Sequence, residues 1–359
     1  MNIIFFENQI ESLSFFSHEL ADAYRSVGMD ILFLDFKNPA GARNEIRRFN
    51  VPGSTVLLTF NFIGLSGEAA FDVGGGITIW DTLEIQKINI LVDHPLYYAE
   101  QLLGNSPELM QIFCIDRFHL KFLQEHFPKY ERVCFLPLAG NRIKDDHSDI
   151  PINERSFDLF FMANYIPLET ELFDAVSSEF KDTDTDSLIM AMHGMLFIDI
   201  YVRTYFRQKI ISLISDSGQK ILIAGKNWDC FACRHPENII TTGILSSEEC
   251  LMLLKDSRIS LNIMPWFKDG AHDRIFSSML AHTPCLTDMS KYLYEILSPS
   301  KDCLTYTLED TDALPHIIND ALKSPDYLEE IKECAYKKAS LHHTWKNRAK
   351  DIIFSSFFP

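Results

Sequence analysis

The sequence lacks the features that mark several large classes of protein. Its 359 residues contain no apolar run that approaches the roughly 20 residues of a membrane-spanning helix. Basic residues are few, since 33 Lys and Arg stand against 50 Asp and Glu and leave a formal charge of −17. We therefore expect no nucleic-acid partner and no stable membrane insertion. The opening stretch Met1–Glu7 has no basic segment, which favours a first strand over a signal peptide and predicts a cytoplasmic protein.

Cysteine is present, but its spacing matches no recognisable disulfide, metal-binding or redox motif. Among the eight cysteines, the one close pair is Cys230 and Cys233, and the sequence holds no second such pair and no thioredoxin-like context. We interpret these two residues as incidental thiols and predict no metal site. The G-x-S-x-G elbow of hydrolases, the phosphate loop of ATPases and the H-E-x-x-H motif are also missing. These gaps speak against triad hydrolases, phosphate-loop ATPases and zinc proteases.

Short apolar segments alternate with helix-length segments along the whole chain, whose length favours about two domains. Near-continuous apolar strands that alternate with helices predict parallel sheets covered on both faces. The first series of predicted strands comprises Ile3–Phe6, Ile31–Phe36, Val56–Phe62, Ile88–Val92, Gln111–Ile115 and Val133–Leu138, and the second comprises Phe157–Met162, Ile221–Ala224, Ile239–Thr242, Ile259–Met264, Cys285–Thr287 and Cys303–Tyr306.

The polar stretch Asn141–Glu154 reads as a linker between the two series. We therefore assign residues 1–150 to an N-terminal Rossmann-like domain and residues 151–340 to a C-terminal one. Residues 168–216 are predicted to be mostly helical, with a break near Asp182–Asp186. The segment 341–359 contains a final helix that we expect to pack on the first domain through Trp345, Ala349 and Ile352.

In open parallel sheets, ligands bind beyond the carboxyl ends of the strands, so the loops there are the expected binding sites. The loop after Ile259–Met264 contains Gly270, which allows close approach of a ligand, and ends in Arg274 at the start of a helix. Free helix amides and a guanidinium group together favour a phosphate site. The alternative is an ordinary helix start, with Asp273 as the cap and Arg274 in a surface ion pair. Other candidates are Asp269, Ala271 and His272 in the same loop, Gly225, Lys226 and Trp228 after Ile221–Ala224, and Asp288 after Cys285–Thr287.

In the first series, Asp93 and His94 follow the strand Ile88–Val92. A histidine beside a carboxylate is suited to general base catalysis near neutral pH. The alternative is that Asp93 caps the helix that opens at Pro95. We keep both interpretations.

Several of these segments resemble one family. The region Ile259–Asp288, with Ser-Leu-Asn262-Ile-Met-Pro265, Asp269-Gly-Ala-His-Asp-Arg-Ile-Phe and Thr283-Pro-Cys-Leu-Thr-Asp288, is similar to the donor-site region of GT-B glycosyltransferases. It most resembles the bacterial spore-maturation (CgeB-like) group, as do Leu91–Pro95 and the tail His343–Ala349.

The resemblance implies an α/β GT-B fold, in which two Rossmann-like domains face each other across a cleft and the final helix crosses back to the first. It implies a UDP- or GDP-linked sugar donor held by the second domain, with Asn262 among its contacts, and no cofactor or bound metal. The acceptor, a saccharide, protein or small molecule, would bind the first domain. If the reaction inverts the anomeric centre, Asp93 or His94 would deprotonate the acceptor.

One departure leaves the stereochemistry open. Retaining GT-B enzymes of the glycogen-synthase type carry two glutamates eight positions apart, and the matching positions here hold Asp269 and Ser277. Two alternatives to a glycosyltransferase therefore stay open: a nucleotide-sugar 2-epimerase and a non-catalytic protein that binds sugar nucleotides.

Overall fold

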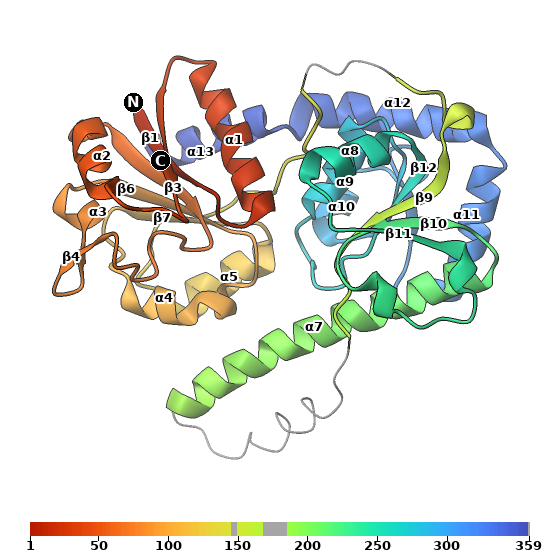
Figure 1. The fold of residues 1–359 in the computed structure, drawn as a ribbon, viewed down its shortest axis with the longest axis horizontal. Coiled ribbons are helices and arrows are strands. Elements are labelled where there is room, and N and C mark those ends of the chain that lie inside the picture. Colours follow the sequence, from red (N-terminus) through yellow and green to blue (C-terminus); the bar gives the residue numbers. More distant parts are fainter. Residues whose placement is uncertain (145–148, 168–184, 358–359) are drawn as a thin grey trace. The chain divides into compact units, whose positions relative to one another are not determined.

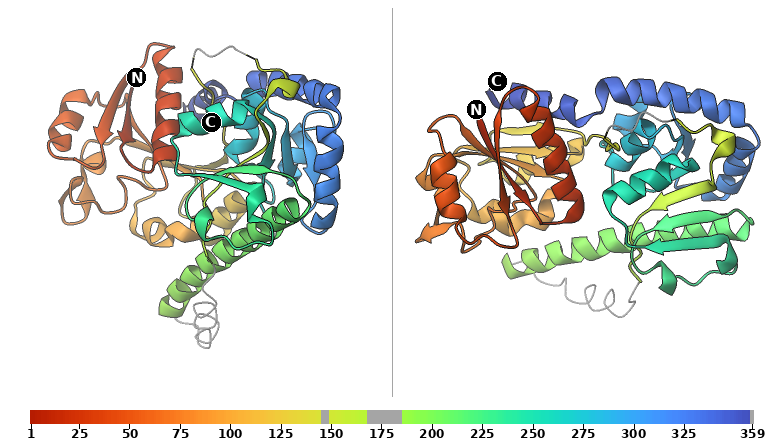
Figure 2. Two further views of the ribbon diagram at one scale, coloured as in Figure 1. Left: turned by 45° about the vertical axis from the view of Figure 1, so that its right-hand side comes forward. Right: turned by 45° about the horizontal axis from the view of Figure 1, so that its top comes forward.

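The computed structural model describes residues 1–144, 149–167 and 185–357. The chain divides into two compact units (Figure 1). Unit 1 comprises Met1–Leu138 and Trp345–Pro359, and unit 2 comprises Ala139–Thr344. Each unit is built on its own parallel six-stranded sheet with helices on both faces (Figure 2), which confirms the predicted α/β class with two Rossmann-like domains.

The sheet of unit 1 has the strand order β2-β1-β3-β6-β7-β8. All six residues of β3 are buried, as expected for an apolar strand in the middle of a sheet that is covered on both faces. The strands are β1 (Asn2–Glu7), β2 (Asp30–Asp35), β3 (Thr55–Phe60), β6 (Gln86–Leu91), β7 (Met110–Cys114) and β8 (Val133–Phe135), with a small hairpin of β4 (Asp72–Gly74) and β5 (Ile77–Thr78). The helices are α1 (Glu11–Arg25), α2 (Ala42–Phe49), α3 (Ile79–Thr82), α4 (Ala99–Gly104), α5 (Arg117–His126), α13 (Trp345–Phe357) and the 3-10 helix η1 (Pro95–Tyr98).

The sheet of unit 2 has the strand order β11-β10-β9-β12-β13-β14. Its helix α8 begins with the capping box Ser246–Glu249, in which each side chain binds the backbone N–H of the other residue. The strands are β9 (Phe157–Met162), β10 (Ile221–Ala224), β11 (Ile239–Gly243), β12 (Ser257–Asn262), β13 (Cys285–Asp288) and β14 (Leu304–Tyr306). The helices are α7 (Thr185–Asp216), α8 (Ser247–Lys255), α9 (Asp273–Leu280), α10 (Lys291–Ile296), α11 (Leu314–Leu322) and α12 (Pro325–His342), with 3-10 helices η2 (Ile152–Glu154), η3 (Trp228–Cys230), η4 (Pro236–Asn238) and η5 (Thr311–Ala313).

The final helix α13 returns to unit 1 and lies beside α1 (Figure 1). The ring of Trp345 lies 4.8 Å from that of Phe16, and the hydroxyl of Tyr24 donates to the carbonyl of Ala349 at 3.3 Å. The predicted apolar face is buried, because Trp345, Ala349 and Ile352 are all less than 5 % exposed. The predicted return of this helix to the first domain is confirmed.

The chain enters unit 2 earlier than the predicted linker suggests. Residues 139–150, which we assigned to the first domain, belong to unit 2, and so do residues 341–344. The amide of Gly140 donates to the carbonyl of His343 at 2.9 Å, and that of Asn141 donates to Ser277 Oγ at 2.9 Å. A Cβ atom at Gly140 would lie 2.4 Å from the backbone of Phe276. Gly140 and Asn141 are therefore held by specific contacts within unit 2.

Other differences are local. Helix α10 was not predicted, and strand β8 ends at Phe135 instead of Leu138. The predicted helix before Asp182 and the start of the predicted break lie outside the described residues, while Thr185 and Asp186 already belong to α7. Among the described helices, none combines the length and the apolar character that crossing a membrane requires.

Candidate functional site

The strand order of unit 2 defines where a ligand is expected. Its first strand, β9, lies in the middle of the sheet, and the connections from β9 and its neighbour β12 run toward opposite edges. In open α/β sheets, ligands bind at the carboxyl ends of the two strands that flank such a switch point. The segments there are 163–165, after β9, and the loop 263–272, after β12.

Buried polar contacts hold the carboxyl end of β12 in place. Oδ1 of Asp288 accepts from the backbone N–H of Met264 at 2.8 Å, and Nδ2 of Asn262 donates to Thr287 Oγ1 at 2.9 Å. The hydroxyl of Tyr306 donates to the carbonyl of Asn262 at 2.9 Å. Burial raises the pKa of Asp288 to about 6. Two predicted donor contacts, Asn262 and Asp288, thus lie in the sheet edge beneath the loop and brace it.

The loop itself is tied to the start of α10. The hydroxyl of Ser290 donates to the carbonyl of Gly270 at 2.6 Å and accepts from the amide of Leu293, so Ser290 caps α10. Gly270 and Ala271 are buried, and Asp269 is half-buried. The backbone of the loop is therefore fixed in position where it leads into α9.

Helix α9 begins with His272 in the cap position, so the alternative in which Asp273 is the cap is wrong. Nδ1 of His272 lies 2.6 Å from the carboxylate of Asp273 and 3.4 Å from the backbone nitrogen of Arg274. The other oxygen of Asp273 accepts from Asn141 Nδ2 at 3.4 Å. Burial, and then the charge of Arg274, lowers the pKa of His272, which favours a neutral imidazole.

Arg274 is not part of a surface ion pair. Its guanidinium group donates to the carbonyl of Met162, the last residue of β9, and lies 6.0 Å from the ring centroid of Phe161. Burial lowers the pKa of Arg274, and the neighbouring charge of Arg203 acts in the same direction. The side chain therefore spans from α9 to the carboxyl end of the first strand.

Two further arginines reach this place from α7. Asp199, Arg203 and Arg207 are spaced four residues apart and share one face of the helix. Arg203 pairs with Asp199 at 2.7 Å, and Arg207, which is 9 % exposed, donates to the carbonyl of Asn164 at 2.5 Å. Burial lowers the pKa of Arg207 to about 9, and the charges of Arg274 and Arg203 add to that effect.

Arg203, Arg207 and Arg274 form an arginine cluster whose members repel one another. In each of the three, Nε is buried and has no hydrogen-bond partner among the described residues. Buried donors without partners and gathered like charges are both unfavourable, and one bound anion relieves both. The geometry therefore suits a multiply charged anion such as a phosphate or diphosphate.

The loop after β10 serves mainly to hold the chain. Gly225 has a φ of +150°, and a Cβ atom there would lie 2.1 Å from the carbonyl oxygen of Ala163, so glycine is needed for the close approach. Trp228 is 3 % exposed, and its Nε1 donates to Ala163 at 2.6 Å. Lys226 has an exposed side chain and a backbone amide that binds Asn164. Of the three candidates in this loop, only Lys226 offers a charged group that a ligand can reach.

In unit 1, Asp93 and His94 lie just beyond the carboxyl end of β6. Nδ1 of His94 accepts from the backbone N–H of Leu96 at 3.1 Å, so His94 caps η1 and the alternative cap by Asp93 is wrong. Burial, and then the neighbouring ring of His119, lowers the pKa of His94 to about 4. The imidazole is therefore neutral near pH 7, and because Nδ1 accepts, its proton lies on Nε2.

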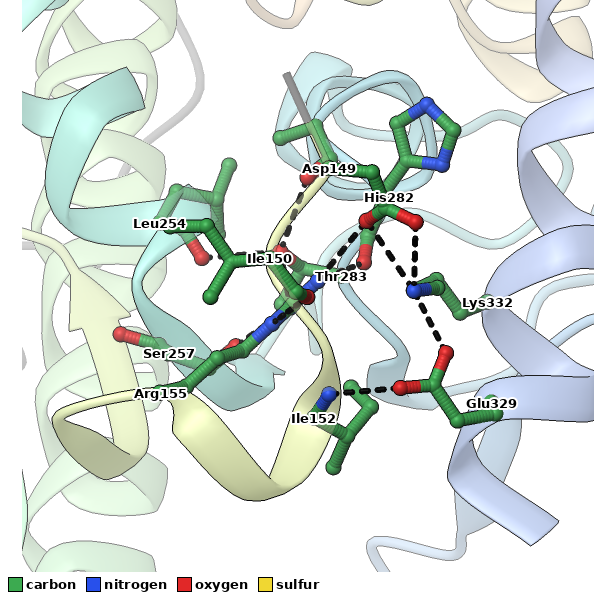
Figure 3. Close-up of polar contacts among 11 residues, drawn as sticks. Asp149, Ile150, Ile152, Arg155, Leu254, Ser257, His282, Thr283, Glu329 and Lys332 are labelled. Carbon is green, nitrogen blue, oxygen red and sulfur yellow. Dashed lines mark hydrogen bonds and ion pairs between the residues drawn. The ribbon is translucent and has the colours of Figure 1, made fainter. Parts of the chain in front are cut away.

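A second polar cluster in unit 2 contains atoms that could bind a metal ion. Ligand atoms of Asp149, His282 and Glu333 lie within 4.8 Å of one another. Both carboxylate oxygens of Asp149 accept from Nζ of Lys332, at 3.0 and 2.8 Å, and the guanidinium group of Arg155 lies 3.8 Å away (Figure 3). Two buried cations thus already balance this carboxylate, and the cluster ties residue 149 to α12.

The comparisons with known proteins agree with this architecture. Residues 203–353 match the model of a family described as glycosyl transferase-like. The comparison with curated proteins finds no match. The matched region contains the complete arginine cluster and extends into α13.

Solved glycosyltransferase structures share the whole fold at low sequence identity. An alpha-glucosyltransferase, in complex with UDP-glucose and DNA containing an abasic site, has a TM-score of 0.65 and 11 % identity, over 99 % of this chain and 98 % of that chain. Anabaena HepE, in complex with UDP-glucose, has a TM-score of 0.61 and 10 % identity over 98 % of both chains. Sucrose-phosphate synthase from Thermosynechococcus elongatus has a TM-score of 0.60 and 10 % identity, over 98 % and 97 %. The fold is GT-B, and the family model and these neighbours together support a GT-B glycosyltransferase.

Sequence reasoning found one arginine of the cluster and missed two. Arg274 stands next to the loop that attracted attention, whereas Arg203 and Arg207 come from a helix about 70 residues earlier, counted from their sequence numbers. The four-residue spacing of Asp199, Arg203 and Arg207 was a usable sign of one polar face, but nothing local placed that face against β9.

Proposed function

We propose that this chain transfers a sugar from a nucleoside-diphosphate sugar to an acceptor nucleophile, with the donor diphosphate bound in unit 2. The observation that carries the proposal is the arginine cluster at the switch point of the sheet. When the bond between the sugar and the diphosphate breaks, its electron pair moves onto a phosphate oxygen. Three guanidinium groups already fixed in place stabilise that charge without reorganisation.

The same cluster supports a reaction that needs no bound metal. In many phosphate-transfer sites, a divalent cation neutralises the leaving group. Here Arg203, Arg207 and Arg274 provide positive charge at the place where the diphosphate would lie, and the exposed Lys226 can add to it. The amides in the first turn of α9 add further donors.

UDP-glucose is the donor we propose to test first, because two of the similar structures are complexes with it. One of those complexes also contains DNA, but the charge of −17 on this chain favours an acceptor without a phosphate backbone. Membership of the spore-maturation group stays a prediction.

Between the two predicted catalytic residues, Asp93 is the better general base. The pKa of His94 is lowered to about 4, and its one neutral acceptor nitrogen already binds Leu96. The carboxylate of Asp93 is exposed and follows a strand of unit 1. We therefore assign proton removal from the acceptor to Asp93 and a structural cap to His94.

Calorimetric titration with UDP, GDP, dTDP and their glucose conjugates tests the proposal. Replacing Arg274 by Ala, or Arg207 by Gln, should weaken diphosphate binding about 10- to 100-fold if each makes a charge-assisted contact. Arg258→Ala is the matched control, since Arg258 pairs with Asp158 at the amino end of β12 and should leave the Kd unchanged. Unchanged affinity in both test variants would remove the cluster from the donor site.

Product analysis separates the remaining alternatives. An epimerase alters the sugar of a UDP-sugar without any acceptor, whereas a transferase releases UDP to water or to an acceptor. A protein that binds UDP-sugars with no turnover at all would be a binding protein, and that result would contradict the proposed transfer.

A further inference from the structure

The carboxylate of Asp93 is held by one of its two oxygens. Oδ2 accepts from Nδ2 of Asn61 at 3.1 Å and from the hydroxyl of Tyr98 at 2.9 Å. Among the described residues, Oδ1 has no hydrogen-bond partner, and the side chain is exposed. Two donors on the same oxygen fix the plane of the carboxylate and leave the other oxygen open.

Asn61 is itself rigidly placed. Its side-chain carbonyl accepts from the amide of Val92 at 2.9 Å, and its own amide donates to the carbonyl of Ile90 at 3.0 Å. Its φ of +51° lies in the left-handed region, which asparagine tolerates better than most residues. The backbone N–H and the side-chain oxygen of Asn61 therefore both bind the chain at the end of β6. These two hydrogen bonds fix the side-chain amide with Nδ2 directed toward Asp93.

Tyr98 reaches Asp93 from the end of η1. The cap formed by His94 shapes this turn, and the ring of Tyr98 lies 6.1 Å from that of Phe62. Burial, and then the charge of Asp93, raises the pKa of Tyr98 far above its usual value. The phenol therefore remains a protonated donor at any working pH.

We propose that Asn61 and Tyr98 are positioning residues that orient Oδ1 of Asp93 toward the acceptor hydroxyl. This inference rests on the proposed function. The acceptor proton moves to Oδ1, the acceptor oxygen bonds to C1 of the sugar, and the C1–O bond to the diphosphate breaks with its electron pair on the leaving diphosphate.

Hydrolysis of UDP-glucose, with water as the acceptor, tests the role of Tyr98. The variant Tyr98→Phe keeps the ring and removes only the donor, so kcat should fall about 10-fold while KM for UDP-glucose changes less than about twofold. Tyr130→Phe is the control, because its hydroxyl donates to the carbonyl of Leu102 elsewhere in unit 1. It should leave kcat unchanged.

A double-mutant cycle separates positioning from general stability. Asp93→Asn alone should lower kcat by roughly 10²–10⁴-fold, and adding Tyr98→Phe should then change nothing further. Asn61→Asp keeps the oxygen that binds Val92 but replaces the donor with a negative charge, and it should lower kcat at least as much as Tyr98→Phe.

The outcomes distinguish this inference from the function beneath it. If the wild type is active but Tyr98→Phe leaves kcat unchanged, or lowers kcat by the same factor with and without Asp93, the positioning role alone would be overturned. A wild type that turns over none of the UDP-, GDP- or dTDP-sugars would overturn both proposals.

Discussion

The charged side chain of Arg207 lies in an unfavourable environment that a bound anion would make favourable. It is buried, donates to the carbonyl of Asn164, and feels the charges of Arg203 and Arg274. Desolvation and the repulsion from the other two guanidinium groups act in the same direction on Arg207, against the charge of Asp199, which pairs with Arg203. The balance shifts when an anion binds, and binding then stabilises the folded state. Ser277 shows a contrasting case, since its hydroxyl already accepts from the backbone amide of Asn141.

Asp288 gives a pH-dependent prediction at the same scale. Burial raises its pKa from 3.8 to about 6 in the folded state, so the stabilising protonated form is complete below about pH 4 and is lost as the pH rises through 6. Asp288→Asn keeps an oxygen for the amide of Met264 but cannot ionise. We expect the variant to gain on the order of 2 kcal/mol relative to wild type between pH 4 and pH 8.

Urea unfolding of both proteins at the two pH values measures this gain. Asp158→Asn, at an exposed position paired with Arg258, is the control and should show a much smaller change. A stability difference between Asp288→Asn and wild type that does not depend on pH would contradict the role of burial.

Among the elements, α13 packs on partners that are far from it in the sequence. Its apolar residues face α1, and its last turn is bound by unit 1: Nε2 of Gln111 donates to the carbonyl of Ser355 at 3.3 Å, and Arg132 donates to that of Ser356 at 2.6 Å. Apolar periodicity in Trp345, Ala349 and Ile352 was sufficient to predict a buried face. It could not specify the partner, which the polar contacts with Gln111 and Arg132 help to select.

Trp345→Ala tests the packing of this helix. The indole is 3 % exposed and lies against Phe16, so its removal leaves a cavity and should destabilise unit 1 by about 3–5 kcal/mol. Phe354→Ala on the same helix is the control, because Phe354 is 68 % exposed and its loss should change stability by less than about 1 kcal/mol. Differential scanning calorimetry reads both. Similar melting curves for the two variants would contradict the packing.

At the scale of the whole molecule, the two sheets could be predicted from the sequence. Their strands are short, near-continuous apolar segments separated by helix-length segments, a pattern typical of parallel sheets covered on both faces. The boundary between the units could not, because Asn141 is polar in sequence yet bonded to Ser277, a contact between residues far apart in the chain. Arg203 and Arg207 could not be predicted as site residues for the same reason, because they lie near Arg274 only once α7 has packed in unit 2. Local patterns specify elements, whereas sites assembled from distant residues require the fold.

The division of the chain leads to a last prediction. Unit 2 is one continuous segment, Ala139–Thr344, and it contains all three arginines of the cluster together with Lys226 and α9. Unit 1 needs both ends of the chain, so it cannot be produced as one simple fragment. We therefore expect a fragment of residues 139–344 to fold and to bind UDP with a Kd within about 10-fold of the full chain, since the charged contacts that dominate diphosphate binding are all present.

The same fragment with Arg207→Gln is the control and should bind about 10- to 100-fold more weakly. Circular dichroism establishes folding, and calorimetric titration measures the Kd. A folded fragment with no measurable affinity for UDP, beside a full chain that binds it, would show that unit 1 supplies an essential part of the donor site.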